Sequence, residues 1–370
     1  MTLIMWWRLL ENALKSLALE MLVDLLKAYS PSGHEEKAIK ILHGYASILG
    51  FDKVYTDDAG NLIAELGYGE KSIALVGHID TIPGELPVII NNDAVTGRGA
   101  VDAKGPLIAM FIGASLAKKH IDLDKFRVYA IAVIGEEGDS KGARELIKKG
   151  FKPSGIIIGE PSNNSIVLGY RGSMKVRIKC SSSPSHASSP PLESPACDKL
   201  IDLWIKIREK YSIFEAELTT ATLLFMQCGD SAGYTIYPHE GSMYIDFRVG
   251  INDTIKSIDE YLKSLITHYS KCYYDVSDYT QPIKTSVNNT IVRALTRAII
   301  MEGKRPRFVY KLGTSDMNLL YSCTSNIVAY GPGKSELSHT DKEEITVEEI
   351  LYGAKVYRNA IKEFFKLISS

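Results

Sequence analysis

The sequence predicts an α/β fold in which a domain with a mostly parallel sheet is interrupted by a small inserted α+β sandwich domain. Its 370 residues exceed the roughly 150 residues of one ordinary domain, so two domains are expected. Continuous apolar runs alternate with helical segments near both ends of the chain, as in a sheet covered by helices. The middle of the chain instead alternates polar and apolar residues. We therefore expect one domain to comprise residues 1–170 and 283–370, with residues 171–282 inserted into it.

The first thirty residues predict an amphipathic helix that packs on the core. Their apolar run over residues 3–7 is too short to span a bilayer and has no basic segment before it, so neither a membrane anchor nor a secretory signal is expected. A second helical pattern follows over 36–49, and turn residues at 57–61 predict a hairpin over 54–66. The apolar residues at helical spacing in the first segment are Leu10, Leu17, Met21, Leu22, Leu25 and Leu26.

Four continuous apolar runs predict strands that are buried on both faces. Helical segments separate these strands, which indicates parallel pairing through crossover helices. The predicted strands cover residues 73–76, 128–134, 156–158 and 327–330, and the predicted helices cover 106–119, 141–149, 290–301 and 347–367.

The segment between about residues 170 and 282 has a different pattern. Residues 174–179 and 241–248 alternate polar with apolar side chains, which is typical of antiparallel strands with one face in solvent. Helical stretches at 197–210 and 254–268 lie among them. This order predicts a small sheet with helices on one face.

The charge balance and the cysteine content argue against several classes of protein. Lys and Arg (43) nearly balance Asp and Glu (44), so no overall field favours nucleic acid or an anionic membrane. The five cysteines are an odd number without a C-x-x-C pair. We therefore expect neither a disulfide framework nor a thiolate metal site, and a reducing cytoplasm fits best.

Acidic and histidine side chains follow each of the four predicted buried strands. Open α/β sheets form ligand sites beyond the carboxyl ends of their strands, so we expect these side chains to gather at one edge. A lone histidine or a pair of glutamates usually has a structural or solvated role, and the shared placement is the informative feature. The residues are His78, Asp80, Glu136, Glu137, Glu160 and His339.

Asp102 joins this group from a separate loop. It lies just ahead of Pro106, which is well placed for a helix start. Asp, Glu and His ligands without a thiolate suit zinc, cobalt or manganese. Three carboxylates and one hydroxide would balance two divalent ions. A nucleotide site has no support, because no P-loop is present and no G-x-G-x-x-G follows a strand.

These motifs together resemble the co-catalytic zinc aminoacylase and carboxypeptidase family, which includes acetylornithine deacetylase and succinyl-diaminopimelate desuccinylase. The resemblance covers nearly the whole chain from about Leu22. It implies a zinc-peptidase-like catalytic domain with an inserted dimerisation or lid domain. The motifs are His78-x-Asp80, Asp102 within GRGAVDAKG, Glu136-Glu137, Glu160 within GEP and His339 within SHTDKE.

The resemblance implies a role for each of the five ligand candidates. His78 and Glu160 would hold one metal ion, while Glu137 and His339 would hold the other. Asp102 would bridge the two ions. Zinc or cobalt is the expected metal.

Three further residues would take part in catalysis by the same resemblance. Asp80 would orient the His78 imidazole by accepting its second N–H, and Glu136 would act as the general base. His186 would reach the partner subunit's site and help stabilise the oxyanion, so a homodimer is expected. The weaker substrate-binding candidates are Arg248, Gly313, Thr314 and Ser315.

Within the family, the chain most resembles the branch that releases lysine or ornithine from the C-terminal glutamate of LysW, a small acidic amino-group carrier protein. The segments GRGAVDAKGPL, GEPSNNSIVLGYRGS and GTSDMN carry this resemblance. It implies a cytoplasmic enzyme of lysine and arginine biosynthesis. An acidic carrier predicts a basic rim around the cleft, with Lys104, Arg171, Lys175 and Lys334 as candidates.

Two alternatives remain at the level of sequence. The first is another activity of the family, namely a small-molecule deacylase, a desuccinylase, a dipeptidase or a carboxypeptidase. The second is a non-catalytic metal-binding or interaction protein on the same fold. Glu136 argues against the second alternative, because a binding module has little use for a base beside its metals.

Overall fold

The computed structural model describes residues 3–212, 217–229 and 235–369, with side chains from residue 11 onward. The chain forms two compact units. Unit 1 comprises Met1–Leu168, Thr285–Val309 and Ser315–Ser370, and unit 2 comprises Gly169–Lys284 and Tyr310–Thr314. Leu10 was also expected to pack on the core, but its side chain is not among the described ones.

A nine-stranded mixed sheet forms the centre of unit 1, with the order β1-β2-β6-β3-β7-β15-β8-β13 and with β14 pairing to β8. Its central neighbours β6, β3, β7 and β15 are parallel, whereas the outer pairs are antiparallel. The predicted α/β class with a mostly parallel central sheet is therefore confirmed. The strands are β1 (Lys53–Thr56), β2 (Leu62–Leu66), β3 (Lys71–His78), β6 (Phe126–Val133), β7 (Gly155–Ile158), β8 (Ile166–Tyr170), β13 (Ile283–Lys284), β14 (Phe308–Lys311) and β15 (Ile327–Ala329).

The central strands are buried on both faces, as their apolar runs predict. All residues of β3 after Lys71 are buried, and β7 and β15 are buried throughout. The expected hairpin over 54–66 is formed by β1 and β2, and the Asp57 side chain accepts hydrogen bonds from the backbone of its turn.

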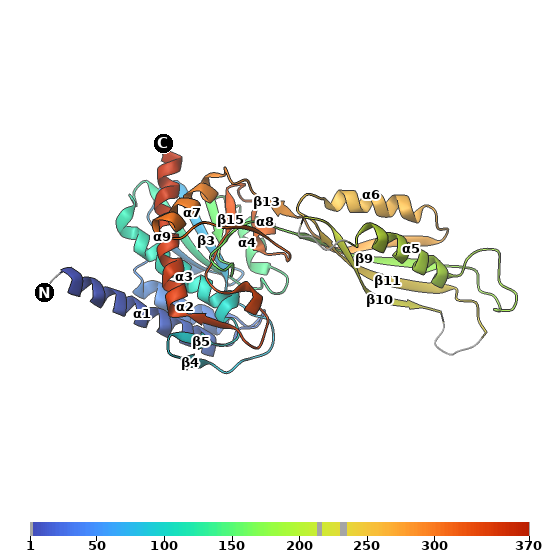
Figure 1. The fold of residues 1–370 in the computed structure, drawn as a ribbon, viewed down its shortest axis with the longest axis horizontal. Helices are drawn as coiled ribbons and strands as arrows, with labels where there is room; N and C mark the ends of the chain where they lie inside the picture. Colours follow the sequence, from blue (N-terminus) through green and yellow to red (C-terminus); the bar gives the residue numbers. More distant parts are fainter. Residues whose placement is uncertain (1–2, 213–216, 230–234, 370) are drawn as a thin grey trace. The chain divides into compact units, whose positions relative to one another are not determined.

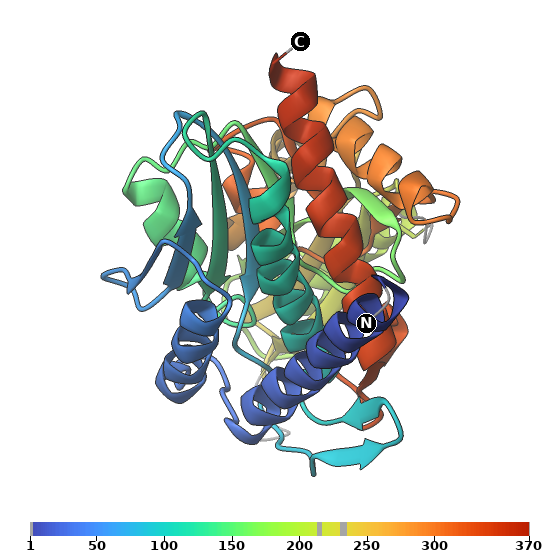
Figure 2. The ribbon, with the colours of Figure 1, turned by 90° about the vertical axis from the view of Figure 1, so that its left-hand side faces the viewer.

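Helices cover the sheet of unit 1. Figure 2 shows α3 and α9 side by side, with α1 crossing near them. The segment Ala100–His120 is long and apolar enough to cross a membrane, but 83% of an apolar 18-residue stretch within it is buried inside the fold, as in the core helix of a folded domain. The helices of this unit are α1 (Leu3–Lys27), α2 (Glu36–Ile48), α3 (Gly105–Ala117), α4 (Lys141–Lys148), α7 (Thr290–Met301), α8 (Asp316–Leu320) and α9 (Val347–Ser369).

The amino-terminal helix packs on the core, as its periodicity predicts. Met21, Leu22 and Leu25 are fully buried and Leu26 is nearly so. A small antiparallel sheet completes unit 1, in the order β16 (Glu344–Thr346), β5 (Ala94–Thr96) and β4 (Ile89–Asn91). It joins the segment after His339 to the segment before Asp102.

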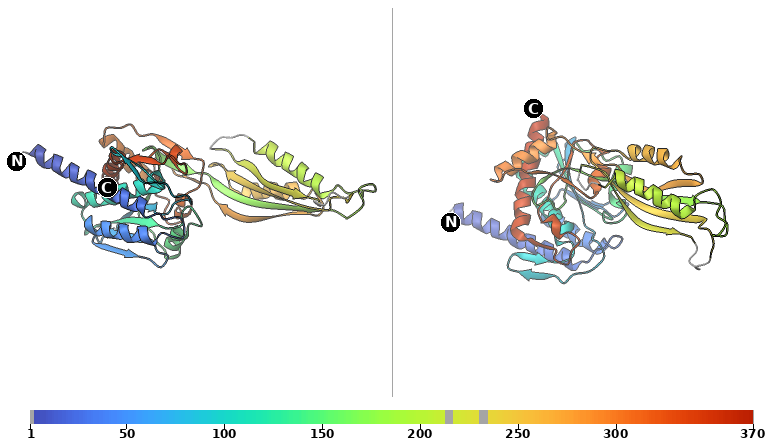
Figure 3. Two further views of the ribbon diagram at one scale, coloured as in Figure 1. Left: turned by 90° about the horizontal axis from the view of Figure 1, so that it is seen from below. Right: turned by 45° about the vertical axis from the view of Figure 1, so that its right-hand side comes forward.

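Unit 2 contains a four-stranded antiparallel sheet in the order β10-β11-β9-β12 (Figures 1 and 3). Inward-facing residues of its strands, such as Ile245 and Phe247, form one core with Leu203 and Leu262 of the two helices. This is the one-sided α+β arrangement that the alternating pattern predicts. The elements are β9 (Gly172–Ser181), α5 (Ala196–Lys210), β10 (Thr220–Cys228), β11 (Glu240–Val249), α6 (Ile255–Ile266) and β12 (Cys272–Thr280).

The cysteine prediction was wrong. Two disulfides, Cys180–Cys272 and Cys197–Cys228, lie in unit 2, and Cys323 is free. The bonded residues are 92 and 31 positions apart in the chain. Cys180 and Cys272 are nevertheless opposite one another on β9 and β12. The pairing depends on strand register and helix packing, which the cysteine spacing does not reveal.

Two residues expected in a basic rim are buried instead. The Arg171 guanidinium donates hydrogen bonds to the carbonyl oxygens of Leu218 and Arg248 and to the Thr220 hydroxyl. The Lys104 amine donates to carbonyl oxygens at the end of α1. Both cations therefore satisfy backbone carbonyls, and neither is available to a protein partner.

Candidate metal centre

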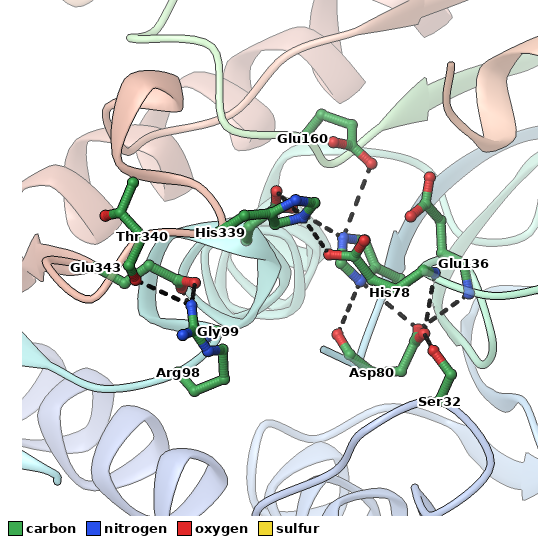
Figure 4. Close-up of polar contacts among 12 residues, drawn as sticks. Ser32, His78, Asp80, Arg98, Gly99, Glu136, Glu160, His339, Thr340 and Glu343 are labelled. Atoms are coloured by element: carbon green, nitrogen blue, oxygen red, sulfur yellow. Dashed lines mark hydrogen bonds and ion pairs between the residues drawn. The ribbon is translucent and has the colours of Figure 1, made fainter. Parts of the chain in front are cut away.

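The five predicted ligands lie together at one edge of the main sheet of unit 1. Figure 4 shows His78, Glu160 and His339 among them. His78 ends β3, while Glu137 and Glu160 lie just beyond β6 and β7. Asp102 lies in the irregular helical turn Ala100–Lys104, and His339 lies in the loop ahead of β16. Ligand atoms of His78, Asp102 and Glu137 all lie within 4.8 Å of one another.

The contacts divide the ligands into two groups with Asp102 between them. Asp102 Oδ1 is 3.1 Å from His78 Nε2, and its Oδ2 is 3.5 Å from His339 Nε2. Glu160 Oε1 lies 3.9 Å from His78 Nε2, and Glu137 Oε1 lies 2.8 Å from His339 Nε2. Each imidazole therefore has its own glutamate, and the two oxygens of one aspartate face opposite imidazoles.

This donor set fits a pair of divalent ions. Imidazole nitrogens and carboxylate oxygens without thiolate are the ligands of hydrolytic zinc, cobalt and manganese sites. The carboxylate of Asp102 is directed to both groups, as a bridging ligand must be. The cluster also has three carboxylates for two histidines, which is more negative charge than a single ion requires.

Asp80 connects the His78 segment to the loop after β6. Its buried carboxylate accepts hydrogen bonds from the Ser32 hydroxyl at 2.6 Å and from the backbone N–H groups of Glu136 and Glu137 at 3.1 and 3.0 Å. The His78 Nδ1 lies 2.9 Å from the Asp80 carbonyl oxygen and 3.6 Å from its carboxylate. Asp80 thus fixes the backbone of two neighbouring site residues, in addition to lying beside the imidazole.

The acidic residues of the site raise the pKa values of both candidate ligand histidines. Burial opposes ionisation of His78, but hydrogen bonding to Asp102 and Asp80 raises its pKa well above the ordinary value. Hydrogen bonding to Glu137 raises the pKa of His339. The carboxylates around the two histidines therefore carry more negative charge than two protonated imidazoles would neutralise. Such an excess of negative charge favours the binding of a metal cation.

Glu136 differs from its neighbour Glu137. Burial raises the pKa of the Glu136 carboxyl well above its ordinary value. The charges of Glu160 and Asp316 add to this increase, while His78 opposes it. A carboxylate with a raised pKa is a stronger base, and Glu136 accepts no hydrogen bond from the two candidate ligand histidines among the described contacts.

The backbone beside the site allows close approach of its loops. A Cβ atom on Gly331, just beyond β15, would lie 2.5 Å from the carbonyl oxygen of Glu160. Only glycine therefore permits this contact between the ends of β15 and β7. Gly99 has φ of 86°, in the left-handed region that favours glycine.

The remaining predicted residues lie outside this cluster. His186 belongs to unit 2, where its ring nitrogens contact Ser188 Oγ at 2.7 Å and Thr235 Oγ1 at 2.9 Å. Arg248, in the same unit, donates to Asp246. Gly313 and Thr314 also belong to unit 2. Ser315 lies in unit 1 and caps α8 by accepting from the Met317 N–H.

Sequence reasoning missed several supporting residues. Ser32 holds Asp80, and Arg98 forms a buried ion pair with Glu343. Asp316 is buried, and neither of its carboxylate oxygens has a hydrogen-bond partner among the described residues. Arg98 and Glu343 stand inside the GRGAVDAKG and SHTDKE motifs, so their proximity to ligands was a visible signal. Asp316 stands inside the GTSDMN motif, so it had the same kind of signal, whereas Ser32 had none.

The fold and the site together define a metallopeptidase-like hydrolase, and comparison with known proteins identifies its family. The family model for peptidase family M20/M25/M40 matches residues 74–363, so the chain belongs to this family. The resemblance inferred from the motifs is thereby confirmed.

Curated relatives are similar over nearly the whole chain. A protein of Saccharolobus solfataricus named "[LysW]-lysine/[LysW]-ornithine hydrolase" is 38% identical over 97% of this chain and 99% of its own length. A protein of Aeropyrum pernix named as a putative enzyme of the same kind is 37% identical over 94% and 96%.

Solved structures share the fold at lower identity. The aminopeptidase PepT of Bacillus cereus has a TM-score of 0.80 at 21% identity, covering 95% of this chain and 99% of that one. An M20 family metallo-carboxypeptidase, Sso-CP2, of Sulfolobus solfataricus has a TM-score of 0.71 at 19% identity, covering 94% and 99%.

Proposed function

We propose that this protein is a metal-dependent amide hydrolase that releases lysine or ornithine from the C-terminal glutamate of the carrier protein LysW, in lysine and arginine biosynthesis. The placement of Asp102 between two histidine–glutamate pairs is the observation that supports metal-dependent hydrolysis. The carrier-linked substrate is supported by the names of relatives that are 37–38% identical over nearly full length.

Two divalent ions, zinc or cobalt, would occupy the site. His78 and Glu160 would hold one ion, Glu137 and His339 the other, and Asp102 both. Ions so held would lower the pKa of water and polarise the amide carbonyl. Asp80 keeps the His78 ring and the Glu136–Glu137 backbone in place through the contacts described above.

Glu136 is the general base in this proposal. It accepts a proton from the attacking water as the water oxygen bonds to the amide carbon, and it returns that proton to the amine nitrogen when the C–N bond breaks. The raised pKa of its carboxyl supports both transfers, because the group can hold the proton between them. The products are the free amino acid and the carrier carboxylate.

We further propose that the enzyme is a homodimer and that residues 171–282 form its dimerisation or lid domain. β10 is an edge strand of its sheet, and Leu224 and Phe225 on it are exposed. A long apolar edge of this kind favours pairing with another chain. His186 would then stabilise the oxyanion in the partner's site. Substrate carboxylate and backbone contacts would come from Arg248, Gly313, Thr314 and Ser315.

The proposed location is the cytoplasm. The two disulfides do not exclude this location, because disulfides occur in intracellular proteins of hyperthermophilic archaea and bacteria. The apolar segment Ala100–His120 is buried in the fold rather than available to a bilayer.

Four residues were expected to form a basic rim around the cleft. Among them, Lys334 is exposed and belongs to unit 1, where it lies between β15 and His339. We propose that it attracts the acidic carrier. The Lys334→Glu variant should slow cleavage of the carrier conjugate several-fold, mainly through association. Cleavage of a small acylated amino acid should change little. The matched control is Lys125→Glu, which reverses another exposed charge of unit 1.

The decisive experiment compares three substrates with purified protein supplied with zinc or cobalt. We expect rapid release of lysine or ornithine from the aminoacylated carrier and slow cleavage of acetylornithine and succinyl-diaminopimelate. Faster cleavage of either small substrate, with no release from the carrier, would overturn the substrate assignment in favour of a small-molecule deacylase. Failure on all three with two ions bound would remove the proposed activity altogether.

A further inference from the structure

The buried ion pair of Arg98 and Glu343 joins the two loops that carry Asp102 and His339. Arg98 Nη1 donates to Glu343 Oε1 at 2.7 Å, and the other carboxylate oxygen of Glu343 accepts from the Gly99 N–H at 2.7 Å. Both side chains are almost completely buried, at 6% and 1% exposure. The pair lies beside the ligand cluster rather than within it (Figure 4).

Arg98 makes further contacts that fix the same two loops. Its Nη1 donates to the Thr340 carbonyl oxygen at 2.9 Å, one residue after His339. Its Nε donates to the Gly84 carbonyl oxygen at 2.8 Å. A second backbone link runs from the Gly97 N–H to the Glu343 carbonyl oxygen. One guanidinium thus ties segments about 240 positions apart in the chain, and none of the proposed metal ligands is among its partners in the described part of the chain.

The two loops have little regular structure of their own. Asp102 departs from helical geometry inside its turn, and His339 has φ of 64°, in the left-handed region. Neither ligand is therefore positioned by a helix or strand, in contrast to His78 at the end of β3. The pairing of β5 with β16 joins the segments that flank the two loops, and the contacts of Arg98 and Glu343 add a constraint closer to the two candidate ligands.

We infer that Arg98 and Glu343 are positioning residues that set the separation of Asp102 and His339, and so determine the affinity of the second metal position. This inference rests on the proposed two-metal function. Glu343 supplies two acceptors to two different donors, and Arg98 supplies a planar set of donors in fixed directions. Lysine cannot reproduce that geometry, although it keeps the charge.

Metal binding to purified, metal-stripped protein tests the inference without any substrate. Zinc affinity would be measured by competition with a chelator for wild type, Arg98→Lys and Glu343→Gln. Visible spectra would be recorded for the same three proteins loaded with cobalt. We expect the ion held by Glu137 and His339 to lose about 10- to 100-fold in affinity, as when residues supporting metal ligands are changed. The ion held by His78 and Glu160 should change less, and the cobalt spectrum should shift.

The matched control is Arg358→Lys, in a partly buried ion pair of unit 1, with Glu302 at 3.1 Å. This variant tests whether an equal loss of stability alone weakens metal binding. If Arg98→Lys and Glu343→Gln lower the melting temperature but bind both ions within twofold of wild type, the positioning role is wrong. If one of the two variants does not fold, the metal affinity of the other variant is judged by the same criterion.

The result is independent of the substrate proposal. A wild-type protein that binds two ions but cleaves no carrier conjugate would contradict the proposed substrate and leave the positioning role intact. A wild-type protein that binds a single ion would contradict the two-metal proposal, and the positioning role would fall with it.

Discussion

The two units differ in how their sheets are buried and cross-linked. Unit 1 buries both faces of the parallel strands at the centre of its sheet, and hydrogen bonds hold buried charged groups such as Asp80 and Arg98 beside the site. Unit 2 buries one face of its sheet, and disulfides link β9 to β12 and α5 to β10. In unit 1, hydrogen bonds between distant segments therefore position the candidate ligands, whereas in unit 2 covalent links stabilise a smaller core.

The largest expected effect would test the chemistry of unit 1 directly. The Glu136→Gln variant keeps the size of the side chain and removes the base. We expect kcat to fall by about 10²- to 10⁴-fold, as for loss of a general base. Metal content should stay at the wild-type value, because Glu136 is not among the proposed ligands. Turnover near the wild-type rate would show that another group is the base.

The second prediction concerns the disulfides and should affect unit 2 alone. In a Trp6→Phe, Trp7→Phe background, Trp204 is the only tryptophan left of three, and it packs against the core of unit 2. The Cys180→Ser, Cys272→Ser variant should lower the stability reported by Trp204 fluorescence by up to about 4.6 kcal/mol, as expected for two cysteines that are 92 positions apart. Reduction breaks both disulfides and should lower that stability further.

Zinc binding by unit 1 is the comparison for the Trp204 measurement on unit 2. Zinc affinity should be unchanged on reduction, because the described disulfides lie outside unit 1. Cys323→Ser, which removes a free thiol, is the control variant. An unchanged Trp204 transition after complete reduction would mean that the disulfides do not stabilise unit 2.

The smallest expected effect is a pH dependence of stability due to Asp316 in unit 1. Burial raises the pKa of this carboxyl to about 7, and nearby Ser140 and His78 offset only part of the increase. The folded state therefore binds a proton that the unfolded state releases, so this group's contribution to stability falls as pH rises from about 4 to about 7.

Asp316→Asn should remove that slope, because asparagine stays neutral. We expect the metal-free variant to equal wild type near pH 4 and to exceed it at pH 8 by as much as about 4 kcal/mol, at about 1.4 kcal/mol per pH unit. Urea unfolding at both pH values measures the difference. The control is Asp122→Asn, an exposed carboxyl paired with Lys125. Parallel pH profiles for wild type and Asp316→Asn would refute the assignment.

Much of the site was predictable because parallel strands end at the same edge of a sheet. The buried runs before His78, Glu137 and Glu160 fixed where those side chains would emerge, and their convergence needed no further information. His339 was expected at the same edge because it follows the predicted strand over 327–330, whereas Asp102 was added from a loop that no periodic element carries.

The partners of buried polar groups were not predictable. Lys104 and Arg171 look like surface cations in the sequence, yet each is buried against backbone carbonyls that other segments supply. The Ser32–Asp80 contact likewise joins residues 48 positions apart.

By itself, the sequence determined the alternation of strands and helices, the one-sided middle sheet and the family motifs, because these follow from local periodicity and residue type. The tertiary structure alone decided which cysteines bond, which cations are buried and how Arg98 meets Glu343. Such contacts depend on strand register and loop packing between distant segments, and the free energy that selects them exists only once the chain is folded.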